Sequence, residues 1–267
     1  MDDSVTAPPG IDISRPSTAR VYDFFLGGAH NFAVDRELAA QIQRTTPNVA
    51  TTMRANRAFL RRAVRYLAGE GIRQYLDLGS GIPTVGNVHE VAQQVAPEST
   101  VVYVDIDSVA VAHSTAILTG NDRAAILRGD LREPAKVLAD VYALNLLDFT
   151  RPIAVLLAGV LHYVGDEYDP AAIVAELRDA VPAGSHLLVS HATLDHQPAE
   201  MRQAQRLSSR MDNELRPRAH AEVAAYFDGL DLIEPGLVFI PLWRPEPDTP
   251  VEHPEQVGGY AGVGRKP

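Results

Sequence analysis

The stretch YLDLGSGIPT, residues 75–84, decides how this sequence folds. An apolar strand ends at Asp77, a turn is made by Gly79 and Gly81, and we predict that a helix begins near Pro83. Glycines let the backbone approach a ligand closely, and the start of a helix offers unpaired amide N–H groups at the positive end of its dipole. The stretch therefore predicts a strand, a turn and a helix with a ligand site at the turn.

Outward from this stretch, short apolar runs alternate with helical patterns. Such runs suit strands that are buried on both faces of a parallel sheet. They cover residues 74–79, 99–107, 124–130, 153–159 and 185–193. Between the last two runs, residues 169–184 carry Asp169 as a cap, Pro170 in the first helical position and an apolar stripe, which predicts a helix. Alternating strands and helices predict an α/β fold with an open, doubly wound sheet.

Four further segments complete the predicted secondary structure. Residues 48–71 form a helix with an apolar face, and residues 201–211 carry a thinner apolar stripe. Residues 232–243 read as a strand interrupted by the pair 235–236, and residues 258–267 as a last strand. The arginines of the first helix fall largely on its other, solvated side: Arg57, Arg61, Arg62 and Arg65.

Acidic side chains end the next two strands after the glycine turn. Asp105 stands 26 residues after Gly79, a spacing that suits a carboxylate binding a ribose diol. Asp130 ends the third strand and is placed to bind an adenine amino group. A dinucleotide fingerprint requires a glycine where Thr84 stands, so the pattern favours S-adenosylmethionine, which has no pyrophosphate. The alternative is a glycine-rich turn with capping acids and no ligand.

The composition limits the possible partners. The 267 residues carry a net charge of −10, which disfavours a nucleic-acid partner and favours a small-molecule substrate. The chain has no cysteine, which excludes disulfides and thiolate ligands. No apolar run is long enough to span a bilayer, and the acidic, proline-rich start is no signal peptide. We expect a cytoplasmic protein without a membrane partner. Nothing in the sequence indicates its oligomeric state.

The segment ARVYDFFLGGAHNFAVDRE, residues 19–37, predicts two short helices joined at a pair of glycines. Such a unit can close over a ligand as a lid. In this interpretation Arg20 pairs with the methionine carboxylate, Tyr22 reaches the pocket, Gly28 allows close approach and Asn31 caps the second helix. The alternative is a corner of two helices that closes the core, with the polar residues pairing among themselves.

Two histidines stand near the strand ends, at the edge of the sheet where such folds bind ligands. His162 comes just after the fourth strand and is the candidate catalytic residue, which polarises or deprotonates the acceptor. Packing under the next loop explains it equally well. His191, in the fifth strand, has the same placement with a weaker case, and we assign it to the acceptor pocket. We predict no metal site, because the sequence lacks an H-E-x-x-H motif.

These residues resemble the class I S-adenosylmethionine-dependent methyltransferases. More narrowly, the chain is similar to the bacterial family called S-adenosyl methyltransferase, formerly a domain of unknown function. The similar stretches are residues 19–37, 56–84, 87–93, 101–107, 154–164, 226–238 and 243–246. They extend over nearly the whole chain after residue 17. The family usually has Lys-Asp where this chain has Ala29 and His30, so a role for charge at those two positions is in doubt.

The resemblance implies a Rossmann-like, seven-stranded sheet in the order 3-2-1-4-5-7-6, with the seventh strand antiparallel and an N-terminal helical lid. It implies cofactor contacts from Asp77, Gly79, Gly81, Asp105 and Asp130. We add their neighbours and the end of the fourth strand to the predicted cofactor site: Ser80, Pro83, Ile106, Leu131, Ala158 and Gly159.

The predicted organisation is a flexible arm over residues 1–17, a helical cap over residues 18–72 and a methyltransferase domain over residues 73–267. The predicted function is methyl transfer from S-adenosylmethionine to an unidentified small-molecule acceptor. Two alternatives remain open. One is a protein of the same fold that binds the cofactor without turnover. The other, which the broken glycine fingerprint disfavours, is an NAD(P)-dependent oxidoreductase.

Overall fold

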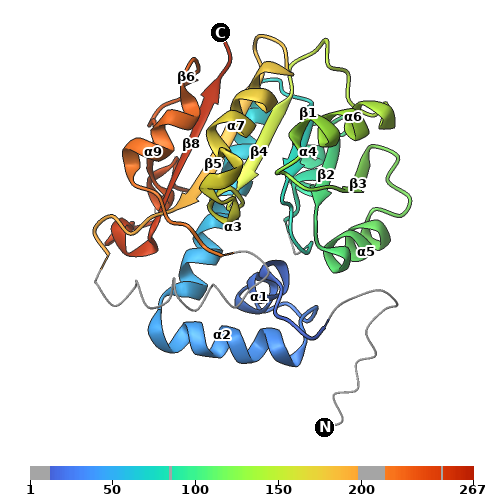
Figure 1. Ribbon diagram of the computed structural model, residues 1–267. Helices are drawn as coiled ribbons and strands as arrows, with labels where there is room; N and C mark the ends of the chain where they lie inside the picture. Colours follow the sequence, from blue (N-terminus) through green and yellow to red (C-terminus); the bar gives the residue numbers. More distant parts are fainter. Residues whose placement is uncertain (1–12, 84–85, 198–213, 248) are drawn as a thin grey trace.

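A central sheet with helices on both faces organises the protein (Figure 1). The computed structural model describes residues 13–83, 86–197, 214–247 and 249–267. The strands are β1 (Gln74–Leu78), β2 (Thr100–Asp105), β3 (Ala124–Arg128), β4 (Ala154–Ala158), β5 (His186–Ala192), β6 (Asp231–Leu232), β7 (Val238–Phe239) and β8 (Gly259–Arg265). The helix predicted over residues 201–211, most of the N-terminal arm, and Thr84 lie outside the described residues.

The strand order is β3-β2-β1-β4-β5-β8-β6, and β7 also pairs with β8. Strands β1 to β5 are parallel to one another, and β8 runs antiparallel to β5. The doubly wound α/β sheet and its antiparallel last strand are therefore confirmed. The predicted sixth strand consists of two pieces, β6 and β7, which flank the Pro235–Gly236 interruption and both pair with β8.

The helices fill the connections between strands. The α-helices are α1 (Thr18–Phe25), α2 (Ala33–Thr45), α3 (Val49–Gly69), α4 (Val88–Val95), α5 (Ser108–Ile117), α6 (Pro134–Leu144), α7 (Pro170–Asp179) and α9 (His220–Ala224). Short 3₁₀ helices are η1 (Leu161–Tyr163), η2 (Asp166–Tyr168), η3 (Ala225–Phe227), η4 (Ile240–Leu242) and η5 (Pro254–Val257). No helix within the described residues combines the length and apolarity that crossing a membrane requires.

The two faces of the sheet carry two separate cores, because successive side chains of a strand point to opposite faces. Leu76 and Val102 belong to a core shared with α6 and α7. Their neighbours Tyr75 and Val101 belong to a core shared with α3 and α4. Burial of both faces explains why each parallel strand reads as a continuous apolar run.

The helices α1 and α2 lie beyond the ends of β2 and β4, at the bottom of Figure 1. Val21 and Phe25 of α1 pack with Leu38 and Ile42 of α2 in a small core that continues onto α3. This core places α1 over the edge of the sheet where the glycine turn lies.

Two predicted helix starts need correction. Helix α4 begins at Val88 and not near Pro83, because Glu90 accepts hydrogen bonds from the N–H groups of Gly86 and Asn87 and fixes the start there. Helix α2 begins at Ala33 after Phe32. Asn31 is therefore not its cap.

Two other helices follow their sequence signals. Helix α3 fills its predicted range, and α7 begins at Pro170 as predicted. Asp169 caps α7 by accepting a hydrogen bond from the N–H of Ala172 at 3.1 Å.

Candidate functional site

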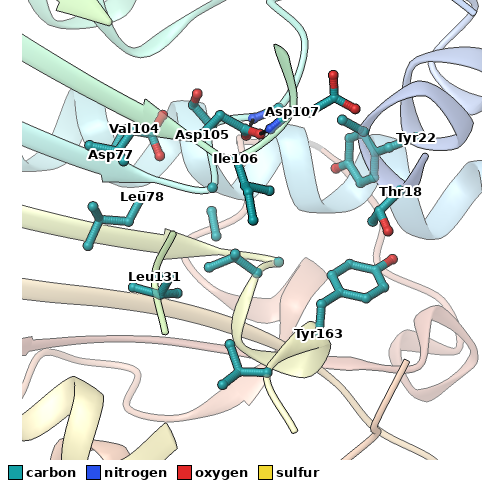
Figure 2. A pocket seen from close by; sticks show the side chains of 18 of the residues that line it. Thr18, Tyr22, Asp77, Leu78, Val104, Asp105, Ile106, Asp107, Leu131 and Tyr163 are labelled. Atoms are coloured by element: carbon teal, nitrogen blue, oxygen red, sulfur yellow. Dashed lines mark hydrogen bonds between the residues drawn. The ribbon is translucent and has the colours of Figure 1, made fainter. Parts of the chain in front are cut away.

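A cavity of about 130 Å³ lies where β1 to β4 end and α1 crosses the sheet edge. We call it the strand-end cavity. Ten of the predicted cofactor residues line it: Asp77, Gly79, Ser80, Gly81, Asp105, Ile106, Asp130, Leu131, Ala158 and Gly159. Pro83 lines a small recess beside it. Figure 2 shows Tyr22 and Thr18 of α1 and Tyr163 of η1 across the cavity from Asp77 and Leu78.

The backbone of the turn after β1 strongly favours glycine at two positions. Gly79 and Gly81 have φ values of +71° and +67°, in the left-handed region. A Cβ on Gly79 would also overlap the side chain of Val160, which follows β4. The N–H of Gly81 donates to Oδ2 of Asp105 at 2.6 Å. The turn thereby joins the ends of three strands into one rigid wall.

Backbone amides hold the carboxylate at the end of β2. Asp105 accepts from the N–H of Asp107 at 2.8 Å in addition to its bond from Gly81. These two bonds fix the orientation of the carboxylate at the edge of the strand-end cavity. Asp107 caps α5 by accepting from the N–H of Val109 at 2.7 Å.

Asp77 and Arg57 line the same cavity and influence each other electrostatically, but they form no direct ion pair. Asp77 is 3% exposed, and no group in the described part of the chain donates a hydrogen bond to its carboxylate. Burial raises its pKa to about 7, a shift that Asp105 increases and the charge of Arg57 opposes. Arg57 donates to the carbonyl of Ile82 at 3.2 Å, while its Nε is buried without a partner among the described residues. The two side chains offer one carboxylate and one guanidinium to a ligand.

The side of the cavity near the end of β3 combines one carboxylate with apolar side chains. Asp130 binds the guanidinium of Arg132 through both carboxylate oxygens, at 2.8 Å between Arg132 Nε and Asp130 Oδ1 and at 2.6 Å between Arg132 Nη2 and Asp130 Oδ2. Burial acts to raise the pKa of Asp130, but the hydrogen bonds from Arg132 outweigh it and leave the pKa below its usual value. Ile106 is 39% exposed although it is a large apolar residue, and Leu131 lines the same cavity. Such a surface suits the faces of a flat ring.

The predicted lid residues separate into two groups. Tyr22 lines the strand-end cavity, whereas Arg20, Gly28 and Asn31 line neither this cavity nor the one described next. Arg20 is buried and its Nε bonds Oδ2 of Asp35 at 2.9 Å. This pair ties α1 to α2.

The loop between α1 and α2 is organised by one buried carboxylate. Asp23 accepts from the side chain of Asn31 and from the N–H of His30, both at 2.9 Å. A Cβ on Gly28 would overlap the Asp23 carboxylate. The Gly-Gly block thus closes the helical corner and leaves Tyr22 to face the site.

A second cavity of about 140 Å³ adjoins the first, and we call it the apolar cavity. Both cavities share a wall made of Thr18, Tyr22, Asn56, Gly159 and Tyr163. His162 and His191 line the apolar cavity only.

The partners of the two histidines fix their tautomers. The N–H of Ala192 donates to Nδ1 of His162 at 3.2 Å, so the proton of the neutral ring is on Nε2. Burial, with His191 and Arg218, holds the pKa of His162 well below its ordinary value. The neutral ring therefore presents Nε2–H, a hydrogen-bond donor and not a base.

His191 is held on both ring nitrogens. Its Nδ1–H donates to the carbonyl of Ala192 at 2.8 Å, and its Nε2 accepts from Arg218 at 3.2 Å. Burial lowers its pKa to about 4, the nearby Arg218 acts in the same direction, and the bond to Ala192 opposes the shift. These bonds give His191 a packing role beside the cavity.

Sequence reasoning missed two residues of α3. Asn56 accepts from the hydroxyl of Ser190 at 2.6 Å and donates to the hydroxyl of Tyr22 at 3.2 Å, which in turn donates to the carbonyl of Met53. This network joins α1, α3 and β5 at the shared wall. The sequence could have indicated Asn56, because it is a polar residue one helical turn before the apolar pair 59–60. Arg57 had no such signal, because it stands among other arginines.

The side chains needed for a metal centre do not gather in the part of the chain that the structure describes. No group of three or more His, Asp and Glu residues there could hold an ion.

Comparisons with known proteins agree with this geometry. The family described as S-adenosyl methyltransferase matches residues 4–267. A crystal structure of a proposed methyltransferase from Thermobifida fusca YX is similar at 40% identity, with a TM-score of 0.91 over 98% of this chain and 99% of its own. A protein of the domain-of-unknown-function family 574 from Streptomyces avermitilis MA-4680 is similar at 39% identity, with a TM-score of 0.90 over 95% of this chain and 98% of its own.

More distant structures share the fold alone. An O-methyltransferase family protein from Burkholderia thailandensis is 16% identical, with a TM-score of 0.51 over 85% of this chain and 62% of its own. No curated protein matches the sequence. The family match over nearly the whole chain and the two close structures confirm the resemblance seen in the sequence. The protein is thus a member of the S-adenosyl methyltransferase family, whose cofactor is S-adenosylmethionine.

Proposed function

We propose that this protein transfers a methyl group from S-adenosylmethionine to a small-molecule acceptor that enters through the apolar cavity. When bound, the cofactor supplies a sulfonium methyl group, which passes to the acceptor atom as the carbon–sulfur bond breaks and a neutral thioether remains. The protein's task in such a transfer is to align the two reactants and to exclude water.

The Asp77 carboxylate without a donor and the Arg57 Nε without a partner, both among the described residues, are the observation that carries this proposal. A buried carboxylate without a donor and a guanidinium with an unused donor are costly unless a ligand completes them. The methionine end of the cofactor carries an ammonium and a carboxylate, which complement these two groups. Asp77 would hold the ammonium and Arg57 the carboxylate.

The other cavity residues suit the remaining parts of the cofactor. Asp105 would accept hydrogen bonds from the ribose diol, since backbone amides already fix its orientation. Ile106 and Leu131 would pack against the adenine, with Asp130 near its amino group. Glycine at 79 keeps this wall open to the ligand. These residues bind and orient, and none of them needs to exchange a proton.

The shared wall favours methyl transfer over simple cofactor binding. A protein that only sequesters the cofactor has no use for a second cavity beside it. Here Tyr22, Asn56 and Tyr163 border both cavities, so an occupant of the apolar cavity would lie next to the cofactor. Burial raises the pKa of Tyr22, which keeps its phenol protonated.

The expectation of a cytoplasmic location stays a prediction.

Calorimetry and a labelled-donor screen test the proposal together. S-adenosylmethionine should bind and NAD should not, and Asp105→Ala should weaken binding at least about tenfold because it removes hydrogen bonds to the ribose diol. Methyl-labelled cofactor should then label a component of a metabolite pool. Tight NAD binding without S-adenosylmethionine binding would overturn the cofactor assignment. Binding without labelling across broad pools would favour the non-catalytic alternative.

A further inference from the structure

Among the described residues, no ionised side chain lines the apolar cavity. Aspartate, glutamate, lysine and arginine are all absent from its described lining, and its two histidines are held neutral by burial and by the charge of Arg218. Arg218 itself lies behind His191, and Asp166 pairs with its guanidinium. The strand-end cavity, by contrast, is lined by four charged side chains of the proposed cofactor site.

We propose that the apolar cavity binds an uncharged, single-ring acceptor whose polar group accepts a hydrogen bond from the Nε2–H of His162. This inference deepens the proposed function and rests on it. A charged acceptor would lose its hydration on entering this cavity and find no counter-charge, a cost of several kcal/mol. An uncharged ring meets no such penalty and gains from the burial of its apolar surface.

The size of the cavity sets the size of its occupant. An apolar cavity of about 150 Å³ holds one benzene molecule, and the volume here is about 140 Å³. The side chains of Phe25 and Met53 provide apolar contact, and the rings of Tyr22 and Tyr163 stand in the wall next to the cofactor site.

Two polar atoms in the lining have no partner among the described residues. One is Nε2 of His162, whose other ring nitrogen is fixed by Ala192. The other is the hydroxyl of Thr46, which is buried and unpaired in the described structure. The unpaired, buried hydroxyl of Thr46 is costly, and the Nε2–H of His162 has an unused donor, so a ligand hydroxyl or carbonyl that binds either group would be favoured.

Four single-ring probes test this site on protein saturated with S-adenosylhomocysteine. They are 4-methylphenol, toluene, benzoate and benzylamine, and their affinities can be measured by ligand-observed NMR. We expect 4-methylphenol to bind most tightly, toluene about tenfold more weakly because it lacks the hydroxyl, and the two ions more weakly still. A benzoate or benzylamine affinity above that of 4-methylphenol would overturn the proposal.

Two variants locate the probe and isolate the role of His162. His162→Phe keeps a ring but removes the donor, and should weaken 4-methylphenol about tenfold while leaving toluene within about twofold. His220→Phe, at an exposed position on α9, is the matched control and should change neither affinity. Met53→Trp should fill the cavity and abolish binding of both probes. Equal losses of toluene and 4-methylphenol in His162→Phe would show a packing role and overturn the donor assignment.

Cofactor affinity separates the two proposals. Met53 and His162 line the apolar cavity and not the strand-end cavity, so both variants should bind S-adenosylhomocysteine as the unaltered protein does. Failure of the unaltered protein to bind S-adenosylhomocysteine would contradict the proposed function. Normal S-adenosylhomocysteine binding with no affinity for 4-methylphenol would overturn only the acceptor class.

Discussion

At the scale of single residues, the buried carboxylate of Asp77 makes cofactor binding depend on pH. Burial raises its pKa to about 7, so Asp77 changes its protonation state near neutral pH in the cofactor-free protein. An ammonium binds the ionised form, so the affinity for S-adenosylmethionine should fall about tenfold between pH 8 and pH 6. Calorimetry at these two pH values measures it. An affinity that stays constant over this range would contradict a titration of Asp77 coupled to cofactor binding.

The variant Asp77→Asn serves as the control for this pH effect. It should bind the cofactor weakly and without the pH dependence. The folded-state pKa of Asp77 lies above the unfolded value of 3.8, so its protonation stabilises the fold at low pH, and this stability is lost as pH rises through about 7. Asp77→Asn should therefore raise the melting temperature of the cofactor-free protein at pH 8 and have a smaller effect at pH 5.

Arg57 provides a second test within the same helix. Arg57→Met should weaken S-adenosylmethionine binding about tenfold or more, because it removes the cation proposed to face the methionine carboxylate. Arg54, almost one turn earlier, is exposed, and its side chain hydrogen-bonds the hydroxyl of Thr51. Arg54→Met should leave the affinity unchanged in the same titration. Equal affinities of the two variants would remove Arg57 from the proposed site.

The sequence predicted the residues at the strand ends but not those that reach them from α3. Strand ends of a parallel sheet meet at one edge, so Asp77, Asp105 and Asp130 could be brought together by topology alone. The placement of Asn56 and Arg57 depends on how α3 packs across the sheet, which no local pattern specifies. Arg20 was ambiguous for the same reason, because its partner Asp35 is set by the packing of α1 on α2.

At the scale of elements, substituting Gly28 in the loop between α1 and α2 should reduce stability more than substituting Gly27. Gly28→Ala pushes a methyl group into the Asp23 carboxylate and disturbs its bonds to His30 and Asn31, at an expected cost of about 3 kcal/mol. Gly27 has φ +81° and open space around it, so Gly27→Ala should cost about 1 kcal/mol through backbone strain. Urea denaturation compares the two variants, and a larger loss for Gly27→Ala would refute the role given to Asp23.

Helix starts were the least predictable feature of the elements. The glycine turn suggested a helix at its end, but the capping box of Asn87 and Glu90 places the start of α4 at Val88. Asn31 is a good capping residue by type, yet Asp23 recruits its side chain and Phe32 precedes α2 instead. In both cases a side-chain hydrogen bond decides between starts that the residue pattern allows equally.

At the scale of the whole molecule, the proposed cofactor should couple the sheet edge to α1. Ligand at about 100 times its dissociation constant raises the free energy of unfolding by about 2.7 kcal/mol. Because Thr18 and Tyr22 line the strand-end cavity, S-adenosylhomocysteine should also slow hydrogen exchange in residues 18–25. Thermal unfolding and exchange mass spectrometry measure the two effects. Stabilisation without added protection of residues 18–25 would show that α1 does not close on the ligand.

The position of β8 has a consequence for how the chain is made. β8 lies between β5 and β6 in the sheet but follows all other strands in the sequence, and it forms seven residue pairs with β5. During synthesis on the ribosome, the edge of β5 therefore stays without its neighbour until residues 259–265 emerge. An unpaired strand edge is a template for aggregation. The nascent protein thus passes through a stage in which the five parallel strands are complete and the edge of β5 still awaits β8.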